Sequence, residues 1–256
     1  MRRLPVISYV SLLLVLASGP PAMADPSGSV SMELEFTRLT NVGVYTANLV
    51  QSSSNANVLD SLGHSSWSYM VAPVTHTAAS ADIGTASGHA ETTGLGVSAE
   101  SVATPRPLAD WSWSGWSVSD QQLYFEAVAA GPVRFDFDLS YSFDLETSLN
   151  GEKVLGRLVA YWRLHSSTWD KSGDGSWGWG WGPAFASPLI ARDGADLHGS
   201  GYKIPCFLEV PDFAPGEGLY LDIGAMTYVS AVPVPSAMVL GMLGFGAASL
   251  RLRKHT

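Results

Sequence analysis

Three tryptophans that alternate with glycine are the residues of this chain whose type and spacing best suit ligand binding. They are Trp177, Trp179 and Trp181, and they are separated by Gly178 and Gly180. In an extended backbone every second side chain points to the same face, so the three indoles would repeat about every 6.6 Å along that face. A row of exposed rings can stack on sugar rings, which predicts a carbohydrate-binding surface.

A second tryptophan cluster lies earlier in the chain and consists of Trp111, Trp113 and Trp116. Both clusters also fit a structural interpretation, because a buried tryptophan removes about 150–250 Å² of surface from water. Exposing both clusters would create a large adhesive patch, so packing in or around the core is the favoured interpretation. Carbohydrate binding remains the leading hypothesis for a specific ligand.

A short acidic segment just before the second row of rings matches the first half of a calcium-binding loop. Asp170, Ser172 and Asp174 stand at the first, third and fifth loop positions, and Gly175 follows them. The glutamate that should close such a loop is missing, because Trp181 stands in its place. Short runs of Asp, Ser and Gly also form ordinary turns. We therefore expect a turn and no cofactor, with a structural Ca²⁺ held by Asp170, Ser172 and Asp174 as the alternative.

Motifs for catalysis are missing from the sequence. It contains no G-x-S-x-G elbow, no H-E-x-x-H helix motif and no phosphate-binding G-x-x-x-x-G-K-[ST] loop. The histidines of residues 25–230 have spacings that match no metal site: they are His64, His76, His89, His165 and His198. The chain is therefore not expected to be an enzyme. A glycan-processing enzyme stays the third alternative, because the two carboxylates of a glycosidase can lie far apart in sequence.

The elements that would position these residues are β-strands, because alternation with a period of two dominates the central part of the chain. Between residues 133 and 146, apolar side chains alternate with polar ones that include Asp136, Asp138 and Asp144. Such a strand buries one face and turns an acidic face to solvent. The same pattern predicts strands over residues 30–37, 154–165 and 219–229.

Turn signals and composition complete the predicted fold. The pair Asn150-Gly151 favours a tight hairpin that would lead directly into the returning strand at 154–165. Residues 51–107 are rich in Ser, Ala, Thr and Gly, which predicts thin edge strands joined by long loops. Many short strands and few helices predict one all-β domain over residues 25–230, a jelly-roll-like β-sandwich.

The charge balance limits the partners of this domain. Residues 25–230 carry all 23 acidic residues but only 9 of the 14 basic ones, which gives a formal charge of −14. Nucleic acids and anionic lipids both require cationic patches, so the sequence argues against either as a partner. Cys206 is the only cysteine, which excludes an internal disulfide. Its apolar neighbours favour a buried thiol without a catalytic role.

The first 24 residues predict a signal peptide for general secretion. Arg2 and Arg3 precede an apolar segment at 6–17, and Ala22 and Ala24 form an A-x-A cleavage site. A transmembrane helix is the weaker alternative, because the apolar segment is short.

The last residues of the chain predict a membrane segment with a cytoplasmic end. No residue between 233 and 250 is charged, and Arg251, Arg253 and Lys254 follow at once. A helix over this stretch would be about 27 Å long, close to the ~30 Å of a bilayer core. The cations would act as stop-transfer charges and hold the C-terminus in the cytoplasm. A C-terminal helix buried in the globular domain is the alternative.

Extended proline residues, a glycine-rich apolar segment and a basic end, in this order, resemble the PEP-CTERM sorting signal of bacterial surface proteins. The motif residues are Val232, Pro233, Val234 and Pro235, with Val234 where the family usually has an acidic residue. The resemblance covers residues 231–256 and implies processing by an exosortase-like membrane protease after transient anchoring in the inner membrane. It also implies a destination at the cell surface or in an extracellular polysaccharide matrix.

These observations predict an exported protein with a structural role at the cell surface or in the extracellular matrix. A carbohydrate-binding module that uses the tryptophan clusters is the alternative, and extracellular polysaccharide is then its partner.

Overall fold

Twelve antiparallel strands make up the described part of the chain, and this part contains no helix. The computed structural model describes residues 25–41, 47–60, 62–72, 76–104, 112–126, 130–148, 151–166, 182–213, 215–216 and 218–232. None of the residues in these ranges belongs to a helix with the length and apolarity that crossing a bilayer requires.

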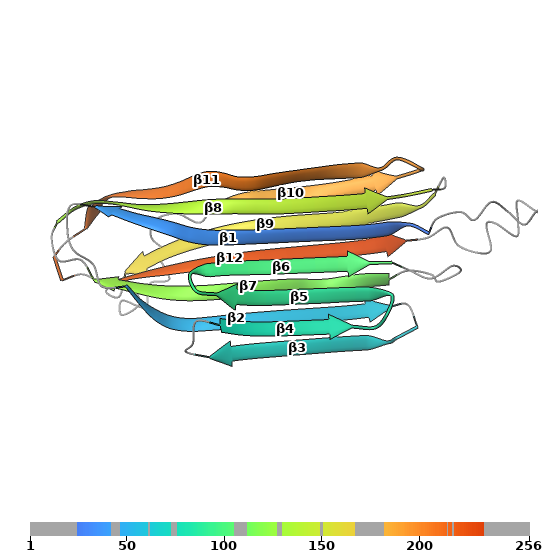
Figure 1. Ribbon diagram of the computed structural model, residues 1–256, viewed down its shortest axis with the longest axis horizontal. Helices are drawn as coiled ribbons and strands as arrows, with labels where there is room; N and C mark the ends of the chain where they lie inside the picture. The colour runs from blue at the N-terminus through green and yellow to red at the C-terminus, as the bar shows by residue number, and fades with distance from the viewer. Residues whose placement is uncertain are drawn as a thin grey trace, which may run out of the picture.

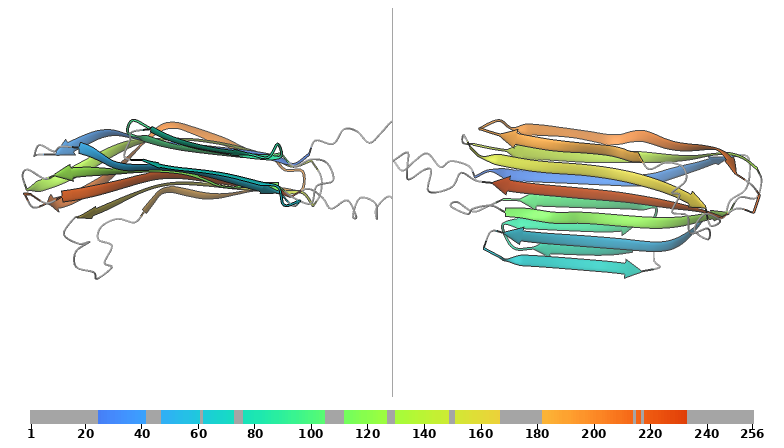
Figure 2. Two further views of the ribbon diagram at one scale, coloured as in Figure 1. Left: turned by 90° about the horizontal axis from the view of Figure 1, so that it is seen from below. Right: turned by 180° about the vertical axis from the view of Figure 1, so that it is seen from behind.

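The strands form two six-stranded sheets that are stacked face to face, as the edge-on view in Figure 2 shows. Sheet A faces the viewer in Figure 1 and has the order β11 (Leu197–Phe213), β8 (Gly131–Glu146), β1 (Ser27–Asn41), β6 (Gly96–Ala103), β5 (Ala86–Thr93) and β4 (His76–Asp82). Sheet B lies behind it and has the order β10 (Gly182–Arg192), β9 (Lys153–Ser166), β12 (Gly218–Val232), β7 (Ser112–Glu126), β2 (Ala47–Asp60) and β3 (Ser65–Ala72). The predicted all-β fold of stacked antiparallel sheets is confirmed.

One half of the space between the sheets holds a large apolar core. The alternation predicted for β8 is present, because Phe135 and Phe137 are fully buried while Asp136 lies on the opposite face of the strand. Phe125 of sheet B packs edge-on against Phe135 with ring centroids 5.3 Å apart, and Phe36 packs against both rings. These aromatic rings join the two sheets across the interior.

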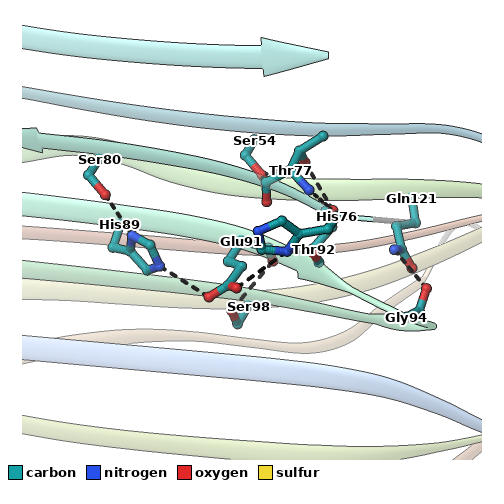
Figure 3. Close-up of polar contacts among 10 residues, drawn as sticks. All are labelled: Ser54, His76, Thr77, Ser80, His89, Glu91, Thr92, Gly94, Ser98 and Gln121. Carbon is teal, nitrogen blue, oxygen red and sulfur yellow. Dashed lines mark hydrogen bonds and ion pairs between the residues drawn. The ribbon is translucent and has the colours of Figure 1, made fainter. Parts of the chain in front are cut away.

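The other half of the interior, between β2, β4, β5 and β6, is lined by small and hydroxylated side chains. The hydroxyl of Ser54 lies 2.8 Å from that of Thr77, which lies 3.0 Å from that of Thr92, and all three residues are fully buried (Figure 3). A methyl group added at Gly88 would lie only 2.6 Å from the Ser117 hydroxyl of sheet B, so the sheets are close together here. Hydrogen bonds between hydroxyl groups satisfy polar atoms that would otherwise be costly to bury.

The prediction of thin edge strands and long loops over residues 51–107 is wrong in part. Strands β3 and β4 are edge strands, as predicted. However, β2, β5 and β6 are interior strands, and β5 connects to β6 through the two residues Gly94 and Leu95. Strands with small side chains pack as part of the sandwich here, because the side chains of the facing sheet are equally small.

The predicted hairpin at Asn150-Gly151 is also wrong, although the chain does turn at this point. β8 pairs with β1 and β11 in sheet A, whereas β9 pairs with β12 and β10 in sheet B. The backbone N–H of Gly151, which has a φ of 94°, donates to Asp193 at 2.9 Å, and the N–H of Ser148 donates to the buried Glu152 at 2.6 Å. These bonds hold the segment in a crossing between the sheets.

The start of β1 and the end of β12 lie at the same end of the sandwich. A methyl group added at Gly28, near the start of β1, would lie 2.7 Å from Val229, near the end of β12. Strand β12 continues to Val232, which pairs with Lys153 and is three residues past the predicted end of this strand at 229. Val232, the first residue of the predicted sorting motif, is therefore part of sheet B.

Candidate binding pocket

Most residues that the sequence singled out lie outside the described residues. These are Ala22, Ala24, Trp111, Asp170, Ser172, Asp174, Trp177, Trp179, Trp181, Pro233, Val234, Pro235, Arg251, Arg253 and Lys254. Trp113 and Trp116 belong to β7, but their side chains are likewise outside the described part. The candidate site therefore comes from other residues.

A pocket of about 480 Å³ lies on the outer face of sheet B, which is the face turned to the viewer in the right-hand view of Figure 2. It crosses four neighbouring strands, β2, β7, β12 and β9. The side chains that give it its chemistry are those of Gln51, Ser53, Asp120, Gln122, Tyr161 and Asp222.

Strand register brings these residues together from four distant parts of the chain. Ser53 is paired with Asp120, Asp120 with Gly224, and Gly224 with Tyr161. Gln51, Gln122 and Asp222 form the next row in the same way. Directly paired residues of antiparallel strands point to the same face, so both rows share the outer surface of the sheet.

Gly224 lies beneath two of the side chains that line the pocket. A methyl group at this position would lie 2.6 Å from Oδ1 of Asp120 and would overlap the ring of Tyr161. The side chains of Asp120 and Tyr161 therefore lean over Gly224 from the strands on either side. A glycine inside a strand often marks such a close approach.

Asp120 is the most perturbed carboxyl group of the pocket. Its Oδ2 accepts a hydrogen bond from the Ser53 hydroxyl at 3.2 Å, but its buried Oδ1 has no hydrogen-bond partner in the described part of the chain. Burial raises the pKa of Asp120 to about 6; the bond from Ser53 opposes this effect, and repulsion by Asp222 adds to it. Asp222 in turn accepts a hydrogen bond from the Gln122 amide at 2.8 Å.

The pocket combines an aromatic ring with hydrogen-bonding groups of several kinds. Tyr161 supplies the ring, Asp120 and Asp222 supply acceptors, and Gln51 and Gln122 supply amides that both donate and accept. None of the described side chains that line the pocket is cationic. This arrangement suits a ligand with many hydroxyl groups.

A second polar cluster lies on the outer face of sheet A, where Glu91 stands between two imidazoles (Figure 3). Its carboxylate lies 3.5 Å from Nδ1 of His76 and 3.3 Å from Nε2 of His89, and the other ring nitrogen of His89 lies 2.8 Å from the Ser80 hydroxyl. Ser80 and His89 are direct cross-strand partners. Ion pairs between such exposed groups contribute about 0–1 kcal/mol, so this cluster chiefly supports the pairing of β4 with β5.

The histidines that looked scattered in the sequence are thus partly brought together, since His76 and His89 contact the same carboxylate. The described residues nevertheless contain no group of three or more His, Cys, Asp and Glu side chains arranged to hold a metal ion.

The remaining residues considered for chemistry lie in ordinary surface contacts. Asp136 accepts a hydrogen bond from Nε of Arg134 at 2.7 Å, and Asp144 contacts Nδ1 of His198 at 2.5 Å. Cys206 lies half-buried on β11, where burial, and then the charge of Asp138, raise the pKa of its thiol. A raised pKa keeps the thiol protonated and poorly nucleophilic.

Pattern analysis of the sequence missed Asp120, Tyr161 and Asp222, because each stands in a strand with unremarkable alternation. The only local signal is Gly224, a glycine in the middle of strand β12. In comparisons with known proteins, no family model, no curated protein and no solved structure matches the chain.

Proposed function

We propose that the protein binds carbohydrate in the pocket on sheet B. The observation that carries this proposal is the position of the Tyr161 ring beside two carboxyl groups and two amides. A sugar ring has an apolar face that packs on an aromatic ring and a rim of hydroxyl groups that donate and accept hydrogen bonds. The pocket offers both kinds of contact within one hollow.

Asp120 gives a reason for a hydroxylated ligand in particular. A buried acceptor without a partner costs about 1–3 kcal/mol, and Oδ1 of Asp120 is such an acceptor. A small rotation of the Tyr161 ring would open this atom to the pocket, where a ligand hydroxyl could donate to it. Binding would then remove part of the cost of burying Asp120.

The place of action proposed for this module is outside the cell. Residues 1–24 would direct export, and residues 231–256 would anchor the precursor in the inner membrane until an exosortase-like protease acts near Pro233-Val234-Pro235. The protein would then have a structural role at the cell surface or in an extracellular polysaccharide matrix, to which the pocket attaches it. The common end from which β1 and β12 leave the sandwich suits a domain that is anchored at that end.

For the sandwich itself we propose a jelly-roll-like arrangement. Seven of the eleven connections between successive strands pass from one sheet to the other. Such repeated crossing supports a chain that winds around both sheets, as in a jelly roll.

Replacing Tyr161 with alanine tests the binding proposal. We expect the affinity for neutral polysaccharide to fall at least tenfold, which corresponds to about 1.4 kcal/mol, because the variant loses the stacking platform. Isothermal titration calorimetry against a panel of soluble glucans, mannans and galactans measures this change. Tyr202→Ala is the matched control, since Tyr202 is 79% exposed on sheet A. Equal losses in both variants, or binding by neither variant nor the unchanged protein, would contradict the proposal.

Replacing Arg251, Arg253 and Lys254 with serine tests the anchor. We expect the precursor to shift from the membrane fraction to the soluble fraction, because the stop-transfer charges are removed. The control carries serine at three exposed cations of the sandwich, Lys153, Arg157 and Arg192. Unchanged fractionation of the tail variant would contradict the proposed membrane anchor at residues 231–256.

A further inference from the structure

Strand β3, at the edge of sheet B, exposes a stripe of large side chains that lie outside the pocket. Trp67 is 73% exposed, Tyr69 is 58% exposed and Val71 is 41% exposed. Their alternate positions place them on one face of the strand. A tryptophan this exposed on an edge strand is unusual, because edges with large apolar side chains promote aggregation.

The stripe lies on the same face of the sheet as the pocket. Val71 is paired with Ser53, which lines the pocket, and Tyr69 and Trp67 are paired with Asn55 and Asn57 of β2. Ser52, Ser54 and the other residues between these β2 positions point into the interior and are buried. The outer face is therefore continuous from Tyr161 on β9, across β12, β7 and β2, to the rings on β3.

We propose that the pocket and the β3 rings form one extended site for a linear, neutral polysaccharide chain that runs across the strands. This inference rests on the proposed carbohydrate binding and deepens it, because it names the class of ligand. The row of paired residues from Tyr161 crosses four strand spacings of about 4.8 Å, or ~19 Å in all, and meets β3 at Val71. Tyr69 and Trp67 lie two and four residues from Val71 along the same strand, so the path runs obliquely across the sheet. Such a length accommodates several consecutive sugar units and exceeds what a monosaccharide needs.

Aromatic rings lie beside hydrogen-bonding side chains at both ends of the path. Tyr161 lies beside the acids and amides of the pocket, and on β3 each ring stands directly opposite an asparagine of β2: Trp67 opposite Asn57 and Tyr69 opposite Asn55. This arrangement matches a polymer in which each unit presents an apolar ring face and hydroxyl groups.

The charges along the path favour a neutral polymer over an acidic one. Among the described side chains, the charged ones of the pocket are Asp120 and Asp222, and the two β2 residues opposite the rings, Asn55 and Asn57, are uncharged. The whole chain has a formal charge of −9. An acidic polysaccharide would be repelled by the two carboxyl groups.

A length series of oligosaccharides tests the extended site in the full chain. The probes are the disaccharides and hexasaccharides of neutral β-glucan, mannan and galactan series, titrated by calorimetry into the unchanged protein and the variants Trp67→Ala and Tyr69→Ala. We expect one hexasaccharide to bind at least tenfold more tightly than its disaccharide. Each β3 variant should lose most of this difference and keep its affinity for the disaccharide. Tyr161→Ala should weaken the binding of both probes.

The outcomes separate this inference from the proposal on which it rests. Equal affinity for short and long probes, or unchanged affinity of both β3 variants, would overturn the extended site and leave binding in the pocket intact. Absence of binding to every probe would overturn both. Light scattering on the same samples tests whether the β3 stripe instead binds a second copy of the chain. If the unchanged protein is a dimer that Trp67→Ala dissociates, and the variant keeps its oligosaccharide affinity, the stripe serves self-association and the extended site is wrong. Both replaced residues are exposed, so the variants should fold.

Discussion

Replacing Asp120 with asparagine should make the protein more stable at pH 8 and flatten its dependence on pH between about 4 and 7. The pKa of Asp120 is raised from 3.8 to about 6 in the folded protein, first by burial and further by repulsion from Asp222. Below pH 4 the carboxyl group is protonated in both the folded and the unfolded states. As the pH rises through 6, the folded state must ionise a buried carboxyl group that the unfolded state ionises readily. Stability is therefore lost with rising pH, by up to about 3 kcal/mol.

Asparagine keeps the shape of Asp120 and remains neutral, so the variant should escape this loss. Urea unfolding at pH 4, 6 and 8 measures the effect. The matched control is Glu100→Gln, which removes a carboxylate from the exposed face of sheet A. A gain of about 2–3 kcal/mol at pH 8 that disappears at pH 4 is expected for Asp120→Asn alone. Parallel pH profiles for the unchanged protein and this variant would show that Asp120 is not held in the environment described for the pocket.

Replacing Phe135 with alanine should be the most damaging single change in the core. Its side chain is fully buried, and its ring packs 5.3 Å from Phe125 and 6.2 Å from Phe36, measured between centroids. Alanine would leave a cavity where the two sheets meet, at an expected cost of about 3–5 kcal/mol. A loss of this size is a large part of the stability of an ordinary domain.

Phe207→Ala is the matched control for the core variant. This ring is 53% exposed on β11, and the Arg134 guanidinium lies 4.1 Å above it, a contact worth about 0.5–1 kcal/mol. Chemical unfolding of the two variants at one pH gives the comparison. Similar losses in both would contradict the position of the apolar core between β8 and β7.

The features that were correctly predicted from the sequence are those that depend on nearest neighbours along the chain. Strand β8 has one face in the core and one in solvent, so the residue types of Phe135 and Asp136 indicate which face each side chain occupies. The final strand was recognised for the same reason. In both cases the solvent on one side makes the alternation of side chains visible.

The failures arise where the decisive partner is remote in sequence. Asn150-Gly151 signals a turn, but the direction of the chain after it depends on Asp193 and on the strands that β9 joins. Residues such as Ser54 and Thr92 look like surface residues, yet both are buried because a facing hydroxyl network satisfies them. No local sequence pattern indicates such a hydrogen-bond network.

The candidate site was unpredictable for a related reason. Asp120, Gly224 and Tyr161 come from three strands, and only the register of sheet B sets them in one row. Trp67 and Tyr69 are aromatic residues in a segment of small ones, but their role depends on the face that they share with the pocket, which only the pairing of β3 with β2 determines. The candidate site therefore depends on how the strands of sheet B pair, and no single segment of the sequence contains it.

A crystal structure of the protein with a bound neutral hexasaccharide from the series above tests the central claim most directly. The account predicts a sugar ring stacked on Tyr161, with its hydroxyl groups within hydrogen-bonding distance of Asp120 and Gln122. It further predicts that the chain continues across β7 and β2 toward Trp67. A sugar bound instead on sheet A, beside His89 and Glu91, or at any position away from the outer face of sheet B, would contradict it.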